Sequence, residues 1–180
     1  MVLTAAAFQT ALNFPFRKLT PTGEISVADT DWDEDTARAY LYWTPHERLA
    51  LSAEYLYEKM KSDRIDPGLP PELYRNMTTH RFPVGARLFL PCGFMARLTA
   101  TYVMQDYQTF DPNTLAPLPD DDRFWIMDAG IGFRLPGRRG LVSVEARNLF
   151  DEDFKFQDTD YLNPAISYER QIFAKVSLSF

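Results

Sequence analysis

Apolar and polar residues alternate with period two along most of this chain, most regularly between Gln171 and Phe180. In an extended strand, residues two apart share a face. The apolar positions of this segment all fall on one face and are Ile172, Ala174, Val176, Leu178 and Phe180. An apolar face that runs to a terminal aromatic residue is unusual in soluble domains and typical of a strand that closes a transmembrane barrel.

The same alternation predicts six further strands, separated by turns that contain proline or glycine. Two weaker segments lie upstream, one with apolar residues between Phe8 and Phe16 and one at Ile25 and Val27. The pattern therefore predicts between seven and nine strands. The six stronger apolar faces lie within residues 37–43, 49–57, 82–90, 94–104, 125–135 and 142–150.

Charge is sorted between the two faces of these strands. The stronger apolar faces contain no charged residue, although 24% of the chain is charged. Five arginines on the opposite faces are predicted to face the interior of a barrel: Arg38, Arg87, Arg97, Arg134 and Arg147. Either they meet carboxylates of a plug or substrate, or they pair with Glu54, Asp128 and Glu145 to satisfy a wet interior. The second interpretation is favoured.

The lengths of the connections separate a membrane barrel from a soluble sandwich, because both sort their faces. Short links near Pro45, Cys92 and Gly137 alternate with long ones over residues 59–77, 108–122 and 151–169. Outer-membrane barrels have short periplasmic turns and long outer loops. The sequence thus predicts an all-β fold, an antiparallel up-and-down transmembrane β-barrel segment of about seven to nine strands that contacts outer-membrane lipid.

The composition of the chain argues against several classes of protein. No run approaches the ~20 apolar residues of a membrane helix. The net charge of -6 and the lack of a basic cluster argue against nucleic acid as a partner. The single cysteine, Cys92, cannot form an internal disulfide. The N-terminal residues do not read as a secretion signal, so we expect any export signal to lie outside this chain.

Leu141 to Phe180 reads LVSVEARNLFDEDFKFQDTDYLNPAISYERQIFAKVSLSF. This text resembles the C-terminal end of TonB-dependent outer-membrane receptors, in which a penultimate strand finishes in an Asn-Leu-Phe-Asp element and the final strand ends in Phe. The matching element here is Asn148, Leu149, Phe150 and Asp151. The resemblance implies a location in the bacterial outer membrane and TonB-energised uptake of an unknown small ligand. It also implies that the barrel assembly machinery recognises the last strand.

The chain departs from that family in having no counterpart of its plug domain or its energy-coupling box. Seven to nine strands are about a third of the family's barrel of roughly twenty-two. We therefore expect a C-terminal fragment that lacks the plug and other barrel strands, with weak strands and an acidic loop in residues 1–35 and barrel strands in 36–180. The alternatives are a complete eight-stranded barrel with a structural or adhesive role and a soluble all-β binding module.

Candidate catalytic chemistry is sparse, and no enzyme, cofactor or metal site is predicted. His46 and His80 fall at opposite membrane faces, which leaves only His80 with a loop serine, Ser62 or Ser167, as a hydrolase candidate. The acidic run 29–35 lacks the Gly and Glu positions of an EF-hand loop, so it is predicted to be a solvated outer loop, as is 120–122. Ligand contacts are expected from the long loops.

Overall fold

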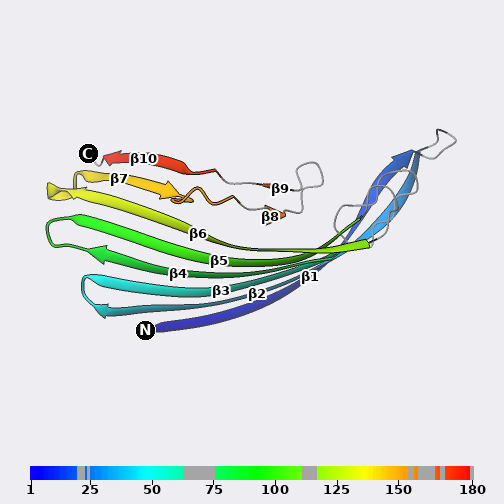
Figure 1. Cartoon of the computed structure of the whole chain (residues 1–180), viewed down its shortest axis with the longest axis horizontal. Helices are drawn as coiled ribbons and strands as arrows, with labels where there is room; N and C mark the ends of the chain where they lie inside the picture. Colours follow the sequence, from blue (N-terminus) through cyan, green and yellow to red (C-terminus); the bar gives the residue numbers. More distant parts are fainter. Residues whose placement is uncertain are drawn as a thin grey trace.

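The structure is a computed structural model that describes residues 1–19, 23, 25–62, 76–110, 117–153, 156–157, 165–166 and 169–178. Eight strands form one antiparallel sheet in which each strand pairs with its neighbour in the chain until β7, which pairs with β10 (Figure 1). The strands are β1 (Val2–Leu19), β2 (Ile25–His46), β3 (Leu49–Ser62), β4 (Asn76–Phe89), β5 (Phe94–Phe110), β6 (Pro117–Leu135), β7 (Gly140–Arg147) and β10 (Gln171–Leu178). The predicted all-β, up-and-down architecture is confirmed.

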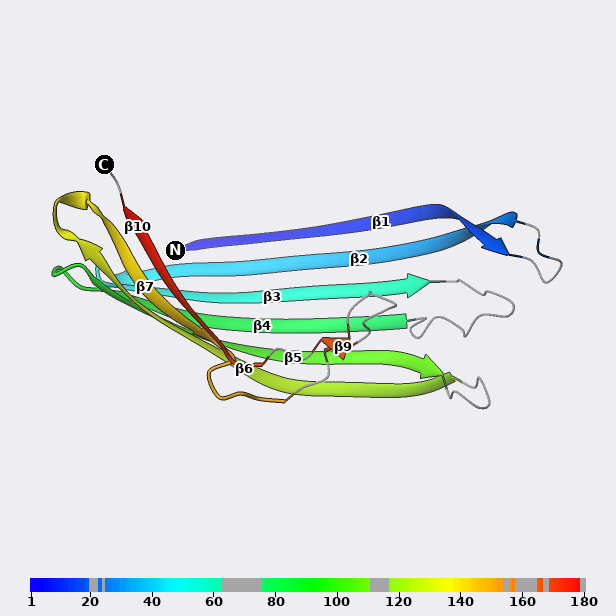
Figure 2. The same cartoon turned by 90° about the horizontal axis from the view of Figure 1, so that it is seen from above.

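The sheet is curved and open (Figure 2). Its edges are β1 and β10, which do not pair with each other. Between β7 and β10 the chain forms a separate two-residue ladder of β8 (Phe156–Gln157) with β9 (Ala165–Ile166). The only helical turn in the described residues is the 3₁₀ turn η1 (Pro136–Arg138). None of the described residues form a helix with the length and apolarity needed to cross a membrane.

The short links are the tightest parts of the fold. Two residues, Glu47 and Arg48, join β2 to β3, and residues 90–93 join β4 to β5. The turn after β6 consists of η1 and Arg139. These turns, the N-terminus and the last described residues of β10 lie at the same end of the sheet (Figure 1), which we call the turn end. The opposite end, where the long connections leave the sheet, is called the loop end.

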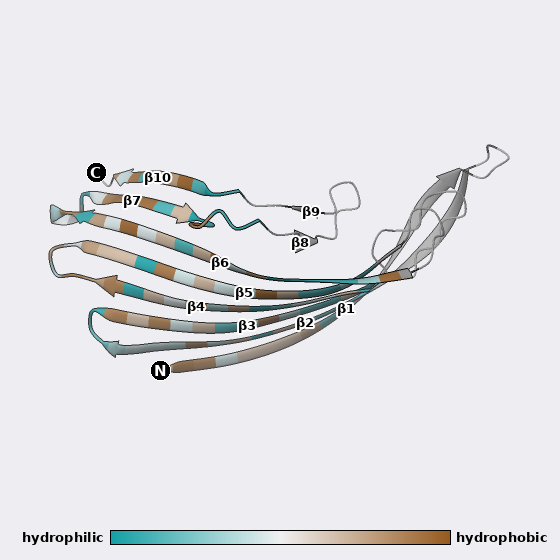
Figure 3. Ribbon diagram, in the orientation of Figure 1, coloured by the Kyte–Doolittle hydropathy of each residue, from teal (hydrophilic) through white to brown (hydrophobic). Residues whose placement is uncertain are grey.

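The register places the predicted apolar residues of neighbouring strands side by side on one face of the sheet. Leu98, for example, lies between Ala86 and Ala129, and Val144 lies between Ile131 and Ala174. We call this the apolar face and the opposite one the polar face. Hydropathy alternates along β3 to β7 (Figure 3), as period-two strands with two different faces require.

The most buried side chains of the strands lie on the polar face towards the loop end. Val103 is 2% exposed and packs with Phe124 (5%), and next to them Gln105 donates a hydrogen bond to Thr79. Met60, Met77 and Tyr107 form a second cluster there. The apolar face is the exposed one: Ile131 and Trp125 are each 55% exposed. Among the described residues, nothing covers the hydrophobic side of this single-layer sheet, whereas the apolar side chains of a layered domain pack into a core between its layers.

Three details of the sequence prediction were wrong. The acidic residues 29–35 belong to β2, paired with β1 and in part with β3, and residues 120–122 belong to β6. Ile25 and Val27 begin β2 and form no strand of their own, so the 35/36 boundary falls inside a strand. The physical reason is that backbone hydrogen bonds hold two strands together whatever their side chains, so a strand does not require an apolar face. At the loop end, charged residues occupy both faces.

The face assigned to the first strand also differs. Phe8 lies opposite Thr36 and therefore on the polar face, whereas Leu3, Ala5 and Ala7 share the apolar face with β2. The small alanines gave a weaker hydrophobic pattern than the phenylalanines did. The side chains of Leu12, Phe14 and Phe16 lie outside the described residues.

Candidate functional site

The apolar face carries a band bounded by aromatic rows. Towards the loop end, Phe82 lies opposite Tyr102, which lies opposite Trp125, and the Tyr102 and Trp125 rings stack with centroids 4.8 Å apart. Tyr55 extends this row, its ring 5.0 Å from that of Phe82. Towards the turn end, Phe94 lies opposite Phe133. Amphipathic aromatic rings of this kind are enriched where a bilayer meets water.

The height of the band is set by β5. The eleven residues from Phe94 to Met104 carry no charge on the apolar face. A transmembrane strand tilted by about 45° needs about 9–11 residues. At the loop end of this stretch the same face becomes charged. Arg123 of β6 lies opposite Met104, and in the next row Lys59 of β3, Asp106 of β5 and Asp121 of β6 share the face. The uncharged stretch thus has the length of a bilayer core.

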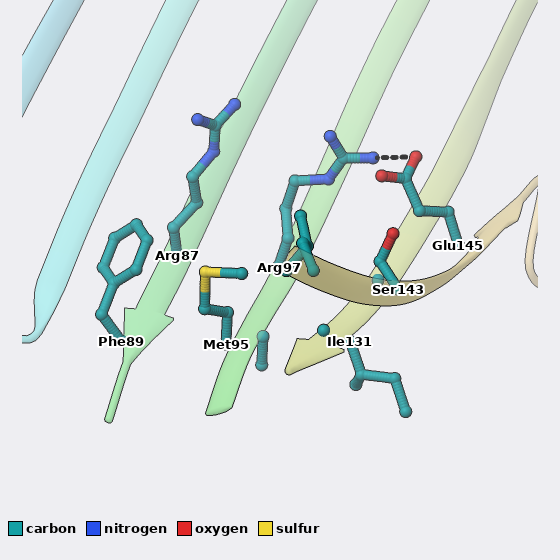
Figure 4. A pocket seen from close by; sticks show the side chains of 11 residues that line it. Arg87, Phe89, Met95, Arg97, Ile131, Ser143 and Glu145 are labelled. Atoms are coloured by element: carbon teal, nitrogen blue, oxygen red, sulfur yellow. Dashed lines mark hydrogen bonds and ion pairs between the residues drawn. The ribbon is translucent and has the colours of Figure 1, made fainter. Parts of the chain in front are cut away.

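A recess of about 220 Å³ opens on the polar face near the turn end, between β4 and β7 (Figure 4). Arg87 and Arg97 lie directly opposite each other in the β4–β5 register. Arg97 donates a hydrogen bond from Nη2 to Glu145 Oε2 at 3.0 Å. Arg87 forms no ion pair with any residue that the structure describes.

Two glycines of β6 leave this recess open. A Cβ atom on Gly130 would lie 3.4 Å from Glu145 Cγ, and one on Gly132 would lie 3.4 Å from Met95 Cε. Larger side chains at these positions would fill the space between the arginines and the next strand. The turn end of the recess is apolar, because Phe89, Met95 and Leu141 line it.

A second cavity of about 430 Å³ adjoins the first, since Arg97 lines both. Its other walls come from the middle of β5 and β6, the end of β7 with the turn that follows, and the residues around the start of β10. They are Thr99, Ile126, Asp128, Arg147, Asn148, Glu169 and Gln171. The two cavities make the polar face hollow along the β5–β7 side of the sheet.

Two of the predicted arginine–carboxylate pairs are confirmed. Arg38 Nη2 lies 2.8 Å from Glu54 Oε2, and the Tyr42 hydroxyl donates to the other Glu54 oxygen at 3.1 Å. The second is the pair of Arg97 with Glu145. Neither Arg134 nor Arg147 forms an ion pair with a described residue; the Arg147 guanidinium lies 5.4 Å from the centre of the Phe173 ring. The alternation also places Arg81 and Glu58 on the polar face, but Arg81 was not among the five predicted interior arginines; the two residues form an ion pair.

The Asn-Leu-Phe-Asp element is a turn that ends β7 and connects three parts of the fold. Asn148 has φ 47° and is 2% exposed. Its backbone N–H donates to Asp128 Oδ1 at 3.0 Å, and the Leu149 N–H donates to the Met127 carbonyl at 2.7 Å, so the turn is fixed to β6. The Asp151 carboxylate accepts from the Arg170 N–H at 2.8 Å and so holds the entry to β10.

The Asn148 side chain closes the turn on itself. Its Nδ2 donates to the Glu152 carbonyl, and its Oδ1 accepts from the Glu152 N–H, both at 2.9 Å. Asparagine combines this pair of groups with tolerance of positive φ. The motif seen in the sequence therefore has a structural cause here.

We expect Asn148→Ala to lower the free energy of unfolding by about 2–4 kcal/mol, because it loses two buried hydrogen bonds and places alanine at positive φ. Asn148→Gly keeps the backbone conformation and loses only the hydrogen bonds, so about 1–2 kcal/mol is expected. Urea titration of the refolded chain measures both. Equal losses in the two variants would contradict the backbone part of this explanation.

The structure describes most of the C-terminal strand that we predict the barrel assembly machinery to recognise. Ile172, Ala174, Val176 and Leu178 lie on the apolar face of β10 and pair in register with β7. Phe180 lies outside the described residues. Recognition of this strand by an assembly machinery stays a prediction.

The histidines lie in different surroundings at the two ends of the sheet. His46 Nδ1 accepts from the Arg48 N–H at 3.1 Å in the β2–β3 turn. His80 lies on the apolar face, where its Nδ1 is 2.9 Å from the Tyr55 hydroxyl. The side chains of Ser62 and Ser167 lie outside the described residues, so the hydrolase candidate stays untested. In the part of the chain that is described, no three acidic, histidine or cysteine side chains come together as metal ligands.

No protein-family model, curated protein or solved structure matches this chain. The residues and their geometry alone therefore support the functional conclusion.

Proposed function

We propose that this chain forms part of the barrel wall of a bacterial outer-membrane receptor, of the TonB-dependent kind that its last forty residues resemble, and that the receptor takes up a ligand. The observation that carries the proposal is the uncovered apolar face, whose uncharged height matches a bilayer. Exposed apolar patches larger than a few hundred Å² are rare on soluble monomers. In lipid, the same side chains contact acyl chains.

The polar face supports the second part of the proposal, that the barrel has a water-filled interior. Its ion pairs and cavities suit a wet interior, in which charged groups pair with each other and with solutes. In this proposal the long loops bind the ligand outside and the polar face lines its path. Energy coupling and closure of the barrel require a plug and further strands as partners. The β10 strand is the part that the assembly machinery recognises.

A complete eight-stranded barrel is the second candidate, because the sheet has eight strands and small outer-membrane barrels have an even number. The unequal lengths of the two edge strands argue against a complete eight-stranded barrel. β1 has 18 residues and β10 has 8, so that pairing them leaves most of β1 without a partner. An open edge of that length is a template for pairing with another strand, which the further strands of a larger barrel would supply.

A cysteine scan tests the membrane assignment. In a Cys92→Ser background, single cysteines replace residues 98–102 of β5 in turn, are labelled with an environment-sensitive fluorophore, and are refolded into vesicles with nitroxide-labelled acyl chains. We expect strong quenching at Leu98, Ala100 and Tyr102 and little at Thr99 and Thr101, because alternate residues face lipid. Quenching without this alternation, or none at all, would contradict the proposal.

A second experiment in the Cys92→Ser chain distinguishes a larger receptor barrel from the complete eight-stranded barrel. Cysteines in place of Ala5 in β1 and Val176 in β10, with neighbouring positions scanned for register, form a disulfide within one chain only if the edges meet. We expect no intramolecular cross-link in vesicles. Efficient cross-linking at one register would replace the receptor proposal with the small complete barrel.

A further inference from the structure

The pairing of Arg87 with Arg97 is electrostatically unfavourable as it stands. Like charges directly opposite each other in an antiparallel pair destabilise the sheet. Glu145 compensates Arg97, and no described residue compensates Arg87 by an ion pair. The site therefore has a guanidinium in excess of its carboxylates.

The surroundings of the recess reinforce this excess. Over the turn-end half of the polar face, strands β4 to β7 and β10 carry five cations and two carboxylates among the described residues, although the chain has a net charge of -6. The cations are Arg87, Arg97, Arg134, Arg147 and Lys175, and the carboxylates are Asp128 and Glu145. Glu169 adds a third carboxylate in the adjoining cavity. A positive concave surface attracts anions.

The shape of the recess selects the size and polarity of an occupant. Its volume of about 220 Å³ is smaller than the ~300–1,000 Å³ of sites for drug-sized ligands. Guanidinium groups line one end and Phe89, Met95 and Leu141 the other. In Figure 4 the Arg87 and Arg97 side chains extend in the same direction from adjacent strands. These features fit a carboxylate on a short apolar stem.

We propose that Arg87 and Arg97 bind a carboxylate group in this recess. Arginine has five N–H donors, and Arg97 uses one of them in the hydrogen bond to Glu145. The Arg87 fork binds the carboxylate in bidentate fashion and the remaining Arg97 donors contact it from the side. The carboxylate belongs either to a small solute or to an acidic side chain of a polypeptide within the barrel. The proposal rests on the proposed function, because the polar face must line a water-filled interior for a solute to reach it.

The test measures binding to the full chain refolded in detergent micelles. The protein carries ¹⁵N-labelled arginine, so the side-chain Nε–H signals report directly on the guanidinium groups. Propionate is the small-solute probe and N-acetyl-aspartate amide is the side-chain probe, with propionamide as the neutral control. We expect both carboxylates to shift arginine signals in a saturable way and propionamide to leave them unchanged. The probe that binds with the higher affinity shows whether the recess prefers the carboxylate of a small solute or that of an acidic side chain.

The variants assign the binding to the recess. Arg87→Gln is expected to weaken carboxylate binding about ten- to a hundredfold, as the loss of charged hydrogen bonds predicts. Arg38→Gln is the matched control: it removes the same charge from the same face of β2, where Arg38 pairs with Glu54 outside the recess, and is expected to change binding less than about twofold. Glu145→Gln removes the competing carboxylate and is expected to tighten binding several-fold.

Equal binding by Arg87→Gln and the parent chain, or no binding by the parent, would overturn the proposal. The period-two quenching pattern of β5 is measured in parallel, on the single-cysteine variants refolded into vesicles. If that pattern is present and binding is absent, only the carboxylate site fails. If the pattern is absent, the proposed function itself fails.

Discussion

Leu98→Lys is expected to destabilise the protein in a bilayer by about 2–4 kcal/mol, the cost of a lysine on the lipid face of a barrel near the bilayer midplane. Leu98 lies in the middle of the uncharged stretch of β5 and is 47% exposed. On the proposed lipid face, its neighbourhood in vesicles is hydrocarbon, where an ammonium group would lose its hydration. The folding equilibrium should therefore shift about 30- to 900-fold. Urea-dependent folding into phospholipid vesicles, followed by tryptophan fluorescence, measures the shift.

Thr99→Lys provides the matched control, since it places the same charge one residue further along β5 on the polar face. There it faces Asp128 of β6 and the adjoining cavity, so a change within about 0.5 kcal/mol is expected. If the apolar face were a water-exposed surface, Leu98→Lys would also fall within that range. Equal effects of the two substitutions would therefore exclude the bilayer assignment.

Gly140→Ala should separate the last strand from the sheet. Gly140 begins β7 opposite Leu178, with φ 152°, a conformation that residues with a Cβ rarely adopt. An added Cβ would overlap the Ser177 carbonyl oxygen and lie 3.1 Å from Leu178 Cα. Because both neighbours are backbone atoms, no side-chain rotation relieves the contact. Strain and overlap together are expected to cost about 3 kcal/mol or more.

Gly130→Ala is the control for this substitution, with the opposite expected sign. A Cβ at Gly130 would make ordinary contacts of 3.4 Å with Glu145 Cγ and 3.6 Å with the Val144 carbonyl oxygen. Alanine in a strand is favoured over glycine by about 0.5–1 kcal/mol. Urea titration and the heat-dependent mobility of the folded form on gels give both values. A Gly140→Ala chain as stable as the Gly130→Ala chain would show that β10 does not pair as the structure has it.

The sequence predicted the two faces of the sheet well because the alternation is local. The apolar positions from Leu49 to Ala146 have their face fixed by their neighbours two residues away, and short turns at Pro45, Cys92 and Gly137 fix the strand order. Phe150, which was predicted to continue the face of residues 142–150, lies instead in the turn after β7. The long strand ends were not predictable in this way. Residues 29–35 carry alternating acids, and their pairing follows from the position of β1, which only the fold provides.

The recess beside Arg87 and Arg97 could not be predicted from the sequence for a related reason. Arg87 and Arg97 were both assigned to the polar face, but their direct opposition depends on the β4–β5 register. Gly130 and Gly132 read as weak points of a strand, and their role in leaving space becomes visible only beside Glu145 and Met95. By contrast, Asn148-Leu149-Phe150-Asp151 was recognisable because its four residues are consecutive in the sequence. The two hydrogen bonds between Asn148 and Glu152 lie within this segment, whereas its bonds to Asp128, Met127 and Arg170 depend on the fold.

The unequal edges of the sheet have a consequence for handling this protein. With an 18-residue ladder open on β1 and an 8-residue ladder open on β10, the chain presents two templates of different length for other strands. A strand that pairs with either edge would add to the stability of the chain alone, by an amount that depends on the concentration of that strand. Reconstitution in trans, with a separately produced piece added during refolding, would therefore raise the free energy of unfolding above the value for the chain alone.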